Sequence, residues 1–119
     1  MPTKTISIDK YIVSHHFFGQ GQTKTYYNFI YCYSEGSPVG RISFIPKDQV
    51  PDSNVIPSPF YFYLYYESNK YQDIIETLRY EKPVYVSVYW DDKNIIITNG
   101  SVSTSKEPIG EQEGGGVPS

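Results

Sequence analysis

Residues 60–66, Phe60-Tyr61-Phe62-Tyr63-Leu64-Tyr65-Tyr66, are the stretch that decides the fold. Aromatic side chains favour strands because they pack well on a pleated surface, and no Gly or Pro interrupts the run. Side chains of a strand point alternately to its two faces. One face of the predicted strand carries Phe62 and Leu64, and the other carries Tyr61, Tyr63 and Tyr65. If the first row faces the core, the second is a row of outward tyrosines.

The composition of the whole chain also indicates a β-rich protein. The 119 residues include thirteen Ile, nine Val and thirteen Tyr, but two Leu and no Ala. β-branched and aromatic residues favour strands, whereas Ala and Leu favour helices. A chain of this length forms one domain. We expect residues 1–106 to form that domain and the acidic, glycine-rich residues 107–119 to be a disordered tail.

Alternating patterns predict six to seven strands in all. They cover residues 4–17 (with a bend near Asp9), 25–33, 39–45, 60–66, 84–89 and 94–98, and a short edge strand follows at 101–106 after a turn at Asn99-Gly100. The 25–33 strand places Tyr27, Phe29, Tyr31 and Tyr33 on one face. Four prolines make residues 46–59 a long surface loop, because each proline removes a backbone donor.

One helix is predicted, over residues 70–81, because Tyr71, Ile74, Ile75 and Leu78 fall at helical spacing and Pro83 limits its extent. This element order predicts a mainly β, single-domain antiparallel fold, a partly closed barrel. It resembles the OB-fold, whose helix lies between a three-strand meander and a terminal hairpin, with one strand too many. A curled sheet wrapped over the helix is the alternative.

Charge and targeting signals exclude several classes of protein. The formal net charge is −3, and residues 1–106 hold ten acidic and ten basic side chains. The scattered cations argue against double-stranded DNA and an anionic membrane surface as partners. There is no signal-peptide pattern, no apolar run approaches the ~20 residues of a membrane span, and the single Cys32 has no disulfide partner. We expect a soluble cytoplasmic protein.

Few residues offer catalytic chemistry. His15 and His16 are consecutive, so in a strand they point to opposite faces, which argues against a shared metal ion. Cys32 has no basic neighbour in sequence and is expected to be a small buried side chain. We predict a protein that is not an enzyme and has no metal or cofactor. The remaining catalytic hypothesis is a small-ligand or enzymatic barrel that uses His15 or His16 in a cavity.

The tyrosines are the strongest functional signal. If Val84, Val86 and Val88 face the core, the tyrosines between them also point outward. The candidate binding surface is then Tyr61, Tyr63, Tyr65, Tyr85, Tyr89 and Arg41. Tyrosine is enriched at protein interfaces, so we predict a non-catalytic module that binds another protein. An unprotected edge strand could also pair two copies into a homodimer.

Two other interpretations use the same tyrosines. They could stack the bases of a single-stranded nucleic acid, which needs a basic groove in which Lys4, Lys10, Lys24, Lys47 and Arg41 converge. They could also do no more than stabilise a two-sided sheet through cross-strand aromatic pairs.

Overall fold

The computed structural model describes residues 2–104 and places them in two sheets and one helix. The strands are β1 (Thr3–Ile8), β2 (Lys10–Phe18), β3 (Thr25–Ser34), β4 (Ser37–Ile45), β5 (Asn54–Pro57), β6 (Phe60–Glu67), β7 (Val84–Trp90) and β8 (Ile97–Ser103). The helix α1 spans Tyr71–Tyr80, and short 3-10 turns lie at Gly21–Thr23, Lys47–Gln49 and Ser68–Lys70. The predicted tail, residues 107–119, lies outside the described residues.

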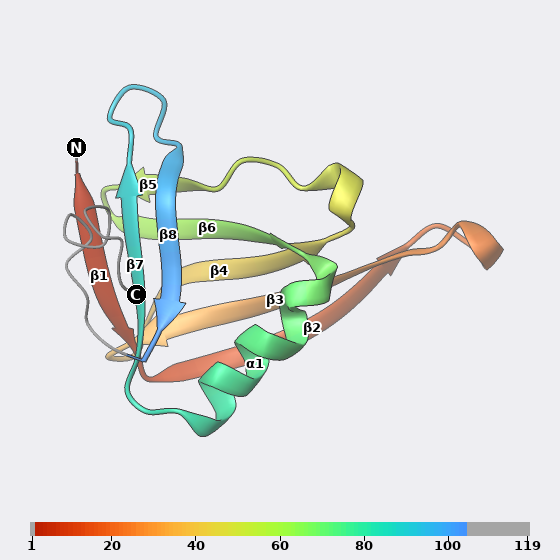
Figure 1. Cartoon of the computed structure of the whole chain (residues 1–119), viewed down its shortest axis with the longest axis horizontal. Coiled ribbons are helices and arrows are strands. Elements are labelled where there is room, and N and C mark those ends of the chain that lie inside the picture. Colours follow the sequence, from red (N-terminus) through yellow and green to blue (C-terminus); the bar gives the residue numbers. More distant parts are fainter. Residues whose placement is uncertain (1, 105–119) are drawn as a thin grey trace.

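The strands form a five-stranded sheet in the order β2-β3-β4-β6-β5 and a three-stranded sheet in the order β1-β7-β8. The strands of the smaller sheet cross those of the larger one steeply, and α1 lies beside the smaller sheet on the same side of the larger one (Figure 1). The core lies on this inner side of the five-stranded sheet. It includes Ile30, Ile42, Phe44, Phe62, Leu64, Ile75, Leu78, Val86 and Val88.

The prediction of a mainly β chain with one helix at 70–81 is confirmed, but the antiparallel barrel is not. Neither sheet closes on itself, and the described residues form eight strands instead of six to seven. β4 and β6 pair in parallel, whereas every other strand pair within the sheets is antiparallel. A parallel pair needs a long crossover, and residues 46–59 supply it. This crossover is more than a loop, because its end forms the edge strand β5, where Pro57 is tolerated.

At the expected bend near Asp9 the chain passes from one sheet to the other. Asp9 is the only residue between β1 and β2, which belong to different sheets. Its backbone N–H donates to the Tyr33 carbonyl (3.1 Å), and its carboxylate accepts a hydrogen bond from the Glu35 N–H (2.7 Å). Glu35 has a φ of +52° in the tight turn between β3 and β4. Asp9 therefore fixes the sheet change and the neighbouring turn together.

The predicted turn at Asn99-Gly100 is wrong. One strand, β8, runs through both residues and replaces the two short strands expected at 94–98 and 101–106. The chain reverses earlier, where the Asp91 carboxylate accepts hydrogen bonds from the Lys93 N–H (2.9 Å) and the Asn94 side chain (3.0 Å). Gly100 is needed for close approach, because a Cβ there would lie 3.1 Å from the Leu64 side chain.

Gly40 on β4 makes the closest approach in the core. The ring of Phe62, its partner residue on β6, lies where a Gly40 side chain would stand, so any added Cβ would overlap the ring. Both residues are buried. The missing side chain at position 40 is therefore a condition for the parallel pairing of β4 and β6.

The substitution Gly40→Ala tests this condition. We expect it to lower the free energy of unfolding by about 1–3 kcal/mol, because the ring must shift to admit a methyl group. Urea unfolding followed by tryptophan fluorescence measures the change. Ser37→Ala, at the exposed start of the same strand, is the control and should stay within about 0.5 kcal/mol of the parent. Equal midpoints for the two variants would contradict this account of the β4–β6 contact.

Candidate functional site

The outer face of the five-stranded sheet carries a continuous aromatic surface. Alternation along each strand directs one row of side chains outward while Ile30, Ile42 and Leu64 point into the core. The pairing register places Tyr31 beside Arg41, and Arg41 beside Tyr63. We call the surface the aromatic face; it comprises Phe18, Tyr27, Phe29, Tyr31, Arg41, Tyr61, Tyr63 and Tyr65.

Arg41 joins the two halves of the aromatic face. Its guanidinium carbon lies 4.9 Å from the ring centre of Phe29 on β3 and 5.3 Å from that of Tyr63 on β6. Its Nε donates to the Ser43 hydroxyl (3.0 Å) and its Nη2 to the Tyr65 hydroxyl (3.4 Å). Cation–π contacts on both sides and two hydrogen bonds hold the side chain along the sheet. Arg41 is thus a packed part of the face, not a free anchor.

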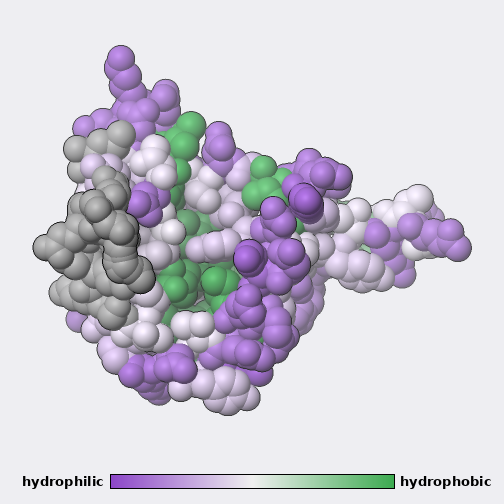
Figure 2. Space-filling view, viewed as in Figure 1, coloured by the Kyte–Doolittle hydropathy of each residue, from purple (hydrophilic) through white to green (hydrophobic). Residues whose placement is uncertain are grey.

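The aromatic face continues onto a projecting hairpin. The ends of β2 and β3 extend beyond the body of the protein as a two-stranded arm (Figure 1). On its outer side the ring of Phe18 meets that of Tyr27 edge to face, with centres 5.3 Å apart. Large aromatic side chains near the tip are strongly exposed: Phe17 is 56%, Phe18 63% and Tyr26 63% accessible. Figure 2 shows the arm standing clear of the molecule.

The structure divides the predicted binding residues between two sheets. Tyr61, Tyr63, Tyr65 and Arg41 come together on the aromatic face. Tyr85 and Tyr89 lie on β7, which pairs with β1 and β8, so they do not join the other four. Their neighbours in register are mostly small and polar, and the hydroxyls of Thr5 and Ser87 are hydrogen-bonded there at 3.0 Å. The expectation of a single six-residue surface is therefore wrong, because local alternation does not show which strands are neighbours.

Sequence reasoning missed Phe18, Tyr27, Phe29 and Tyr31 as members of the surface. The signal was available for three of them, because alternation in residues 25–33 places these aromatic side chains on one strand face. Only the strand order shows that this row lies one strand away from the row on β6. For Phe18 the missing information was the register between β2 and β3, which pairs it with Thr25.

The aromatic face carries little charge. Its one formal charge at neutral pH is that of Arg41. Burial raises the pKa of the Tyr61 phenol, and the neighbouring Tyr63 raises it further. Three of the four lysines expected to converge on Arg41 lie apart from it: Lys10 packs over Tyr33 at one end of the β2–β3 hairpin, and Lys24 packs over Phe17 at the other. Lys4 lies in the smaller sheet.

The residues considered for catalysis or metal binding, His15, His16 and Cys32, do not form a common site. His16 lies on the outer side of the arm and is hydrogen-bonded to Ser14 (2.6 Å), whereas His15 points to the other side and is hydrogen-bonded to Asn28. Neither imidazole lines any of three cavities formed by residues 2–104, including the one of about 570 Å³. No group of three or more His, Cys, Asp or Glu side chains in that range could hold a metal ion. Burial raises the pKa of the Cys32 thiol to about 12.

Comparison of the chain with protein-family models, with curated proteins and with solved structures finds no match. Among residues 2–104, no helix has the length and apolar character that crossing a bilayer requires. The function must therefore be argued from the surfaces of the molecule itself.

The buried thiol of Cys32 gives the protein a pH-dependent stability. Above about pH 9, the ordinary pKa of an exposed thiol, the unfolded chain loses this proton while the folded protein retains it until about pH 12. We expect this thiol alone to lower the free energy of unfolding by about 1.4 kcal/mol per pH unit across that window. Urea unfolding of the parent and of Cys32→Ala between pH 7.5 and 10.5 isolates the effect. A stability difference between them that does not fall above pH 9 would contradict the prediction.

The packing of Arg41 predicts a structural cost for its removal. We expect Arg41→Ala to lower the free energy of unfolding by about 1–2 kcal/mol, because two ring contacts and the packed stem are lost together. Thermal and urea unfolding measure the change. Lys93→Ala, in the exposed turn before β8, removes a charge without such contacts and should have almost no effect. Equal stability of the two variants would show that the ring contacts contribute nothing.

Proposed function

We propose that the protein is a non-catalytic binding module that holds another protein against the aromatic face and the β2–β3 arm. The observation that carries this proposal is the continuity of the aromatic side chains. They extend from Phe18 near the arm tip, through the Arg41 contacts, to the Tyr61–Tyr63 ring pair on β6. Large apolar rings exposed on a projecting hairpin favour a surface that is covered when a partner is bound.

The chemistry of the surface supports a protein partner. The cores of protein interfaces are rich in Tyr, Phe and Arg and poor in other charged residues, which is the composition of the aromatic face. A single-stranded nucleic acid needs cations along its whole path, and here Lys10 and Lys24 lie at opposite ends of the hairpin. The single cysteine is free and buried, which suits a reducing compartment, and we place the module in the cytoplasm.

Site-specific photocrosslinking tests the proposal, because it captures a bound partner whatever its identity. The photoreactive residue p-benzoylphenylalanine replaces Phe18 on the arm in one variant and Tyr80 at the end of α1 in another. Tyr80 is the matched control because it is also a strongly exposed aromatic residue (72%) and lies away from the aromatic face. We expect illumination of cells that naturally contain the protein to give a discrete protein adduct from position 18 and none from position 80.

The character of the adduct decides between the alternatives. Equal labelling from positions 18 and 80 would show non-specific capture and overturn the proposal. An adduct that nuclease removes would assign the surface to nucleic acid. An adduct of twice the chain mass would identify a second copy as the partner and replace a foreign protein with a homodimer. Unchanged melting temperatures of both variants verify that the substitutions leave the fold intact.

A further inference from the structure

A second candidate site lies at the opposite end of β2 from the arm tip. A cavity of about 570 Å³ opens where the chain passes from β1 to β2, facing the last turn of α1 and the segment that leads into β7. This volume falls within the range of small-molecule binding pockets. Its apolar lining consists of Ile8, Leu78, Pro83 and Val84, and Tyr11 contributes an aromatic wall.

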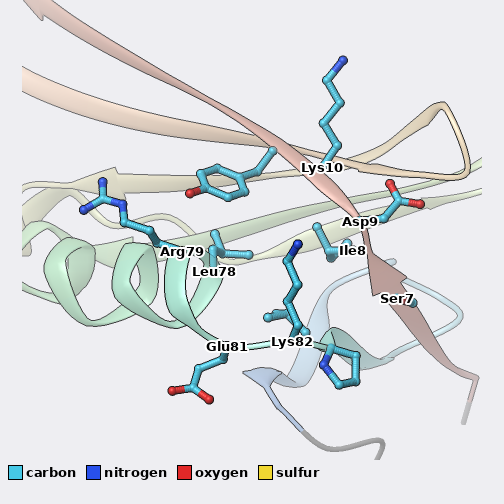
Figure 3. A pocket seen from close by; sticks show the side chains of 11 residues that line it. Ser7, Ile8, Asp9, Lys10, Leu78, Arg79, Glu81 and Lys82 are labelled. Carbon is cyan, nitrogen blue, oxygen red and sulfur yellow. The ribbon is translucent and has the colours of Figure 1, made fainter.

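The positive and negative side chains around the cavity point in different directions. In Figure 3 the Lys82 side chain extends between Ile8 and Leu78, whereas the carboxylates of Asp9 and Glu81 are turned away. Asp9 is also engaged, because it accepts the hydrogen bond from the Glu35 N–H. Among residues 2–104 no ion pair or hydrogen bond neutralises Lys82. Lys82 therefore places a positive charge over the apolar lining of the cavity, and no carboxylate of residues 2–104 pairs with it.

A second cation, Arg79 of the last turn of α1, stands at the rim (Figure 3). Arg79 is charged at any working pH, and the hydroxyls of Tyr80 and Tyr11 raise its pKa further. Of the two cations, Lys82 is the one that extends over the apolar lining (Figure 3). In Figure 3 the Arg79 guanidinium points away from Lys82, so the Lys82 ammonium is the cation that a carboxylate bound over the apolar lining would meet.

We propose that this cavity binds a small amphipathic carboxylate, with the anionic group held by Lys82 and the apolar body placed against Ile8, Leu78 and Val84. The apolar body removes hydrophobic surface from water, and the carboxylate supplies the counter-charge that Lys82 lacks. Both parts of the ligand are needed, because neither the apolar floor nor the exposed cations alone would hold a small molecule firmly. The site is independent of the aromatic face.

Three probes with one apolar body test the proposal: 4-phenylbutyrate, its neutral alcohol 4-phenylbutanol and the cationic 4-phenylbutylamine. Each is titrated into the full-length ¹⁵N-labelled protein and followed by amide correlation spectra. We expect phenylbutyrate to shift the amides of Ile8, Lys10, Leu78 and Val84 and to bind about tenfold more tightly than the alcohol, while the amine shifts none of them. Equal binding of acid and alcohol, or no shifts with millimolar acid, would overturn the proposal.

Matched variants test the two cations. Lys82→Gln should weaken phenylbutyrate binding several-fold, Arg79→Gln should weaken it less, and both should leave the alcohol unaffected. Lys93→Gln removes the same charge in the turn before β8 and should change nothing, whereas Glu81→Gln removes a negative charge from the lining and should not weaken binding. All four positions are exposed, so the variants should retain the parent spectrum elsewhere. Weakening by Lys93→Gln equal to that by Lys82→Gln would mean only general charge attraction and would overturn the assignment.

The chain itself is a second source of carboxylates, because Glu107, Glu111 and Glu113 follow β8, whose end at Ser103 pairs with the beginning of β7. A full-length variant with all three changed to Gln separates the sources. For a free ligand we expect phenylbutyrate to bind this variant and the parent alike. Binding that is tenfold tighter in the variant would assign the cavity to the acidic tail and overturn the proposal of a free carboxylate.

Discussion

The ring of Phe62 rests against the backbone of Gly40, and the parallel pairing of β4 and β6 depends on this contact. A side chain at position 40 would occupy the space of the ring. The pairing sets Arg41 beside Tyr63, and it aligns the outward side chains of β6 with those of β4. It also requires a crossover from one end of β4 back to the start of β6, which adds β5 at the sheet edge. One glycine in the core thus supports the alignment of the Arg41 and β6 side chains on the other side of the sheet.

The aromatic face is held in one arrangement by contacts among its own side chains. Phe29, Tyr63 and Tyr65 all contact Arg41, and the rings of Tyr61 and Tyr63 lie 5.0 Å apart. Side chains already held in one arrangement lose less conformational freedom on binding, so more of the contact energy remains as affinity. Along the arm the rings have fewer neighbours and are more exposed. The surface therefore combines a fixed platform on the sheet with more adaptable side chains near the arm tip.

Local patterns predict the local features of this fold and fail where distant strands meet. Alternation in residues 60–66 correctly separates Phe62 and Leu64 from the outward tyrosines, and helical spacing correctly places α1. The same alternation cannot show that β7 joins a different sheet, so it groups Tyr85 and Tyr89 with the wrong partners. Asn99-Gly100 has the composition of a turn, yet Gly100 serves close packing against Leu64. The cavity beneath Lys82 escapes such patterns, because segments far apart in the chain form it.

The single residue between β1 and β2 has a mechanical consequence. β1 is paired with β7 over six consecutive residues, and β2 carries one side of the arm, so Asp9 joins two stiff members of different sheets. A force applied at the arm tip would therefore reach β1 through Asp9. From β1 the force would pass to its paired strand β7, the central strand of the smaller sheet. Because β1 and β2 cross steeply, this force acts across β1 and loads the Ile8–Val84 end of the β1–β7 pair first, rather than being shared by all of its hydrogen bonds.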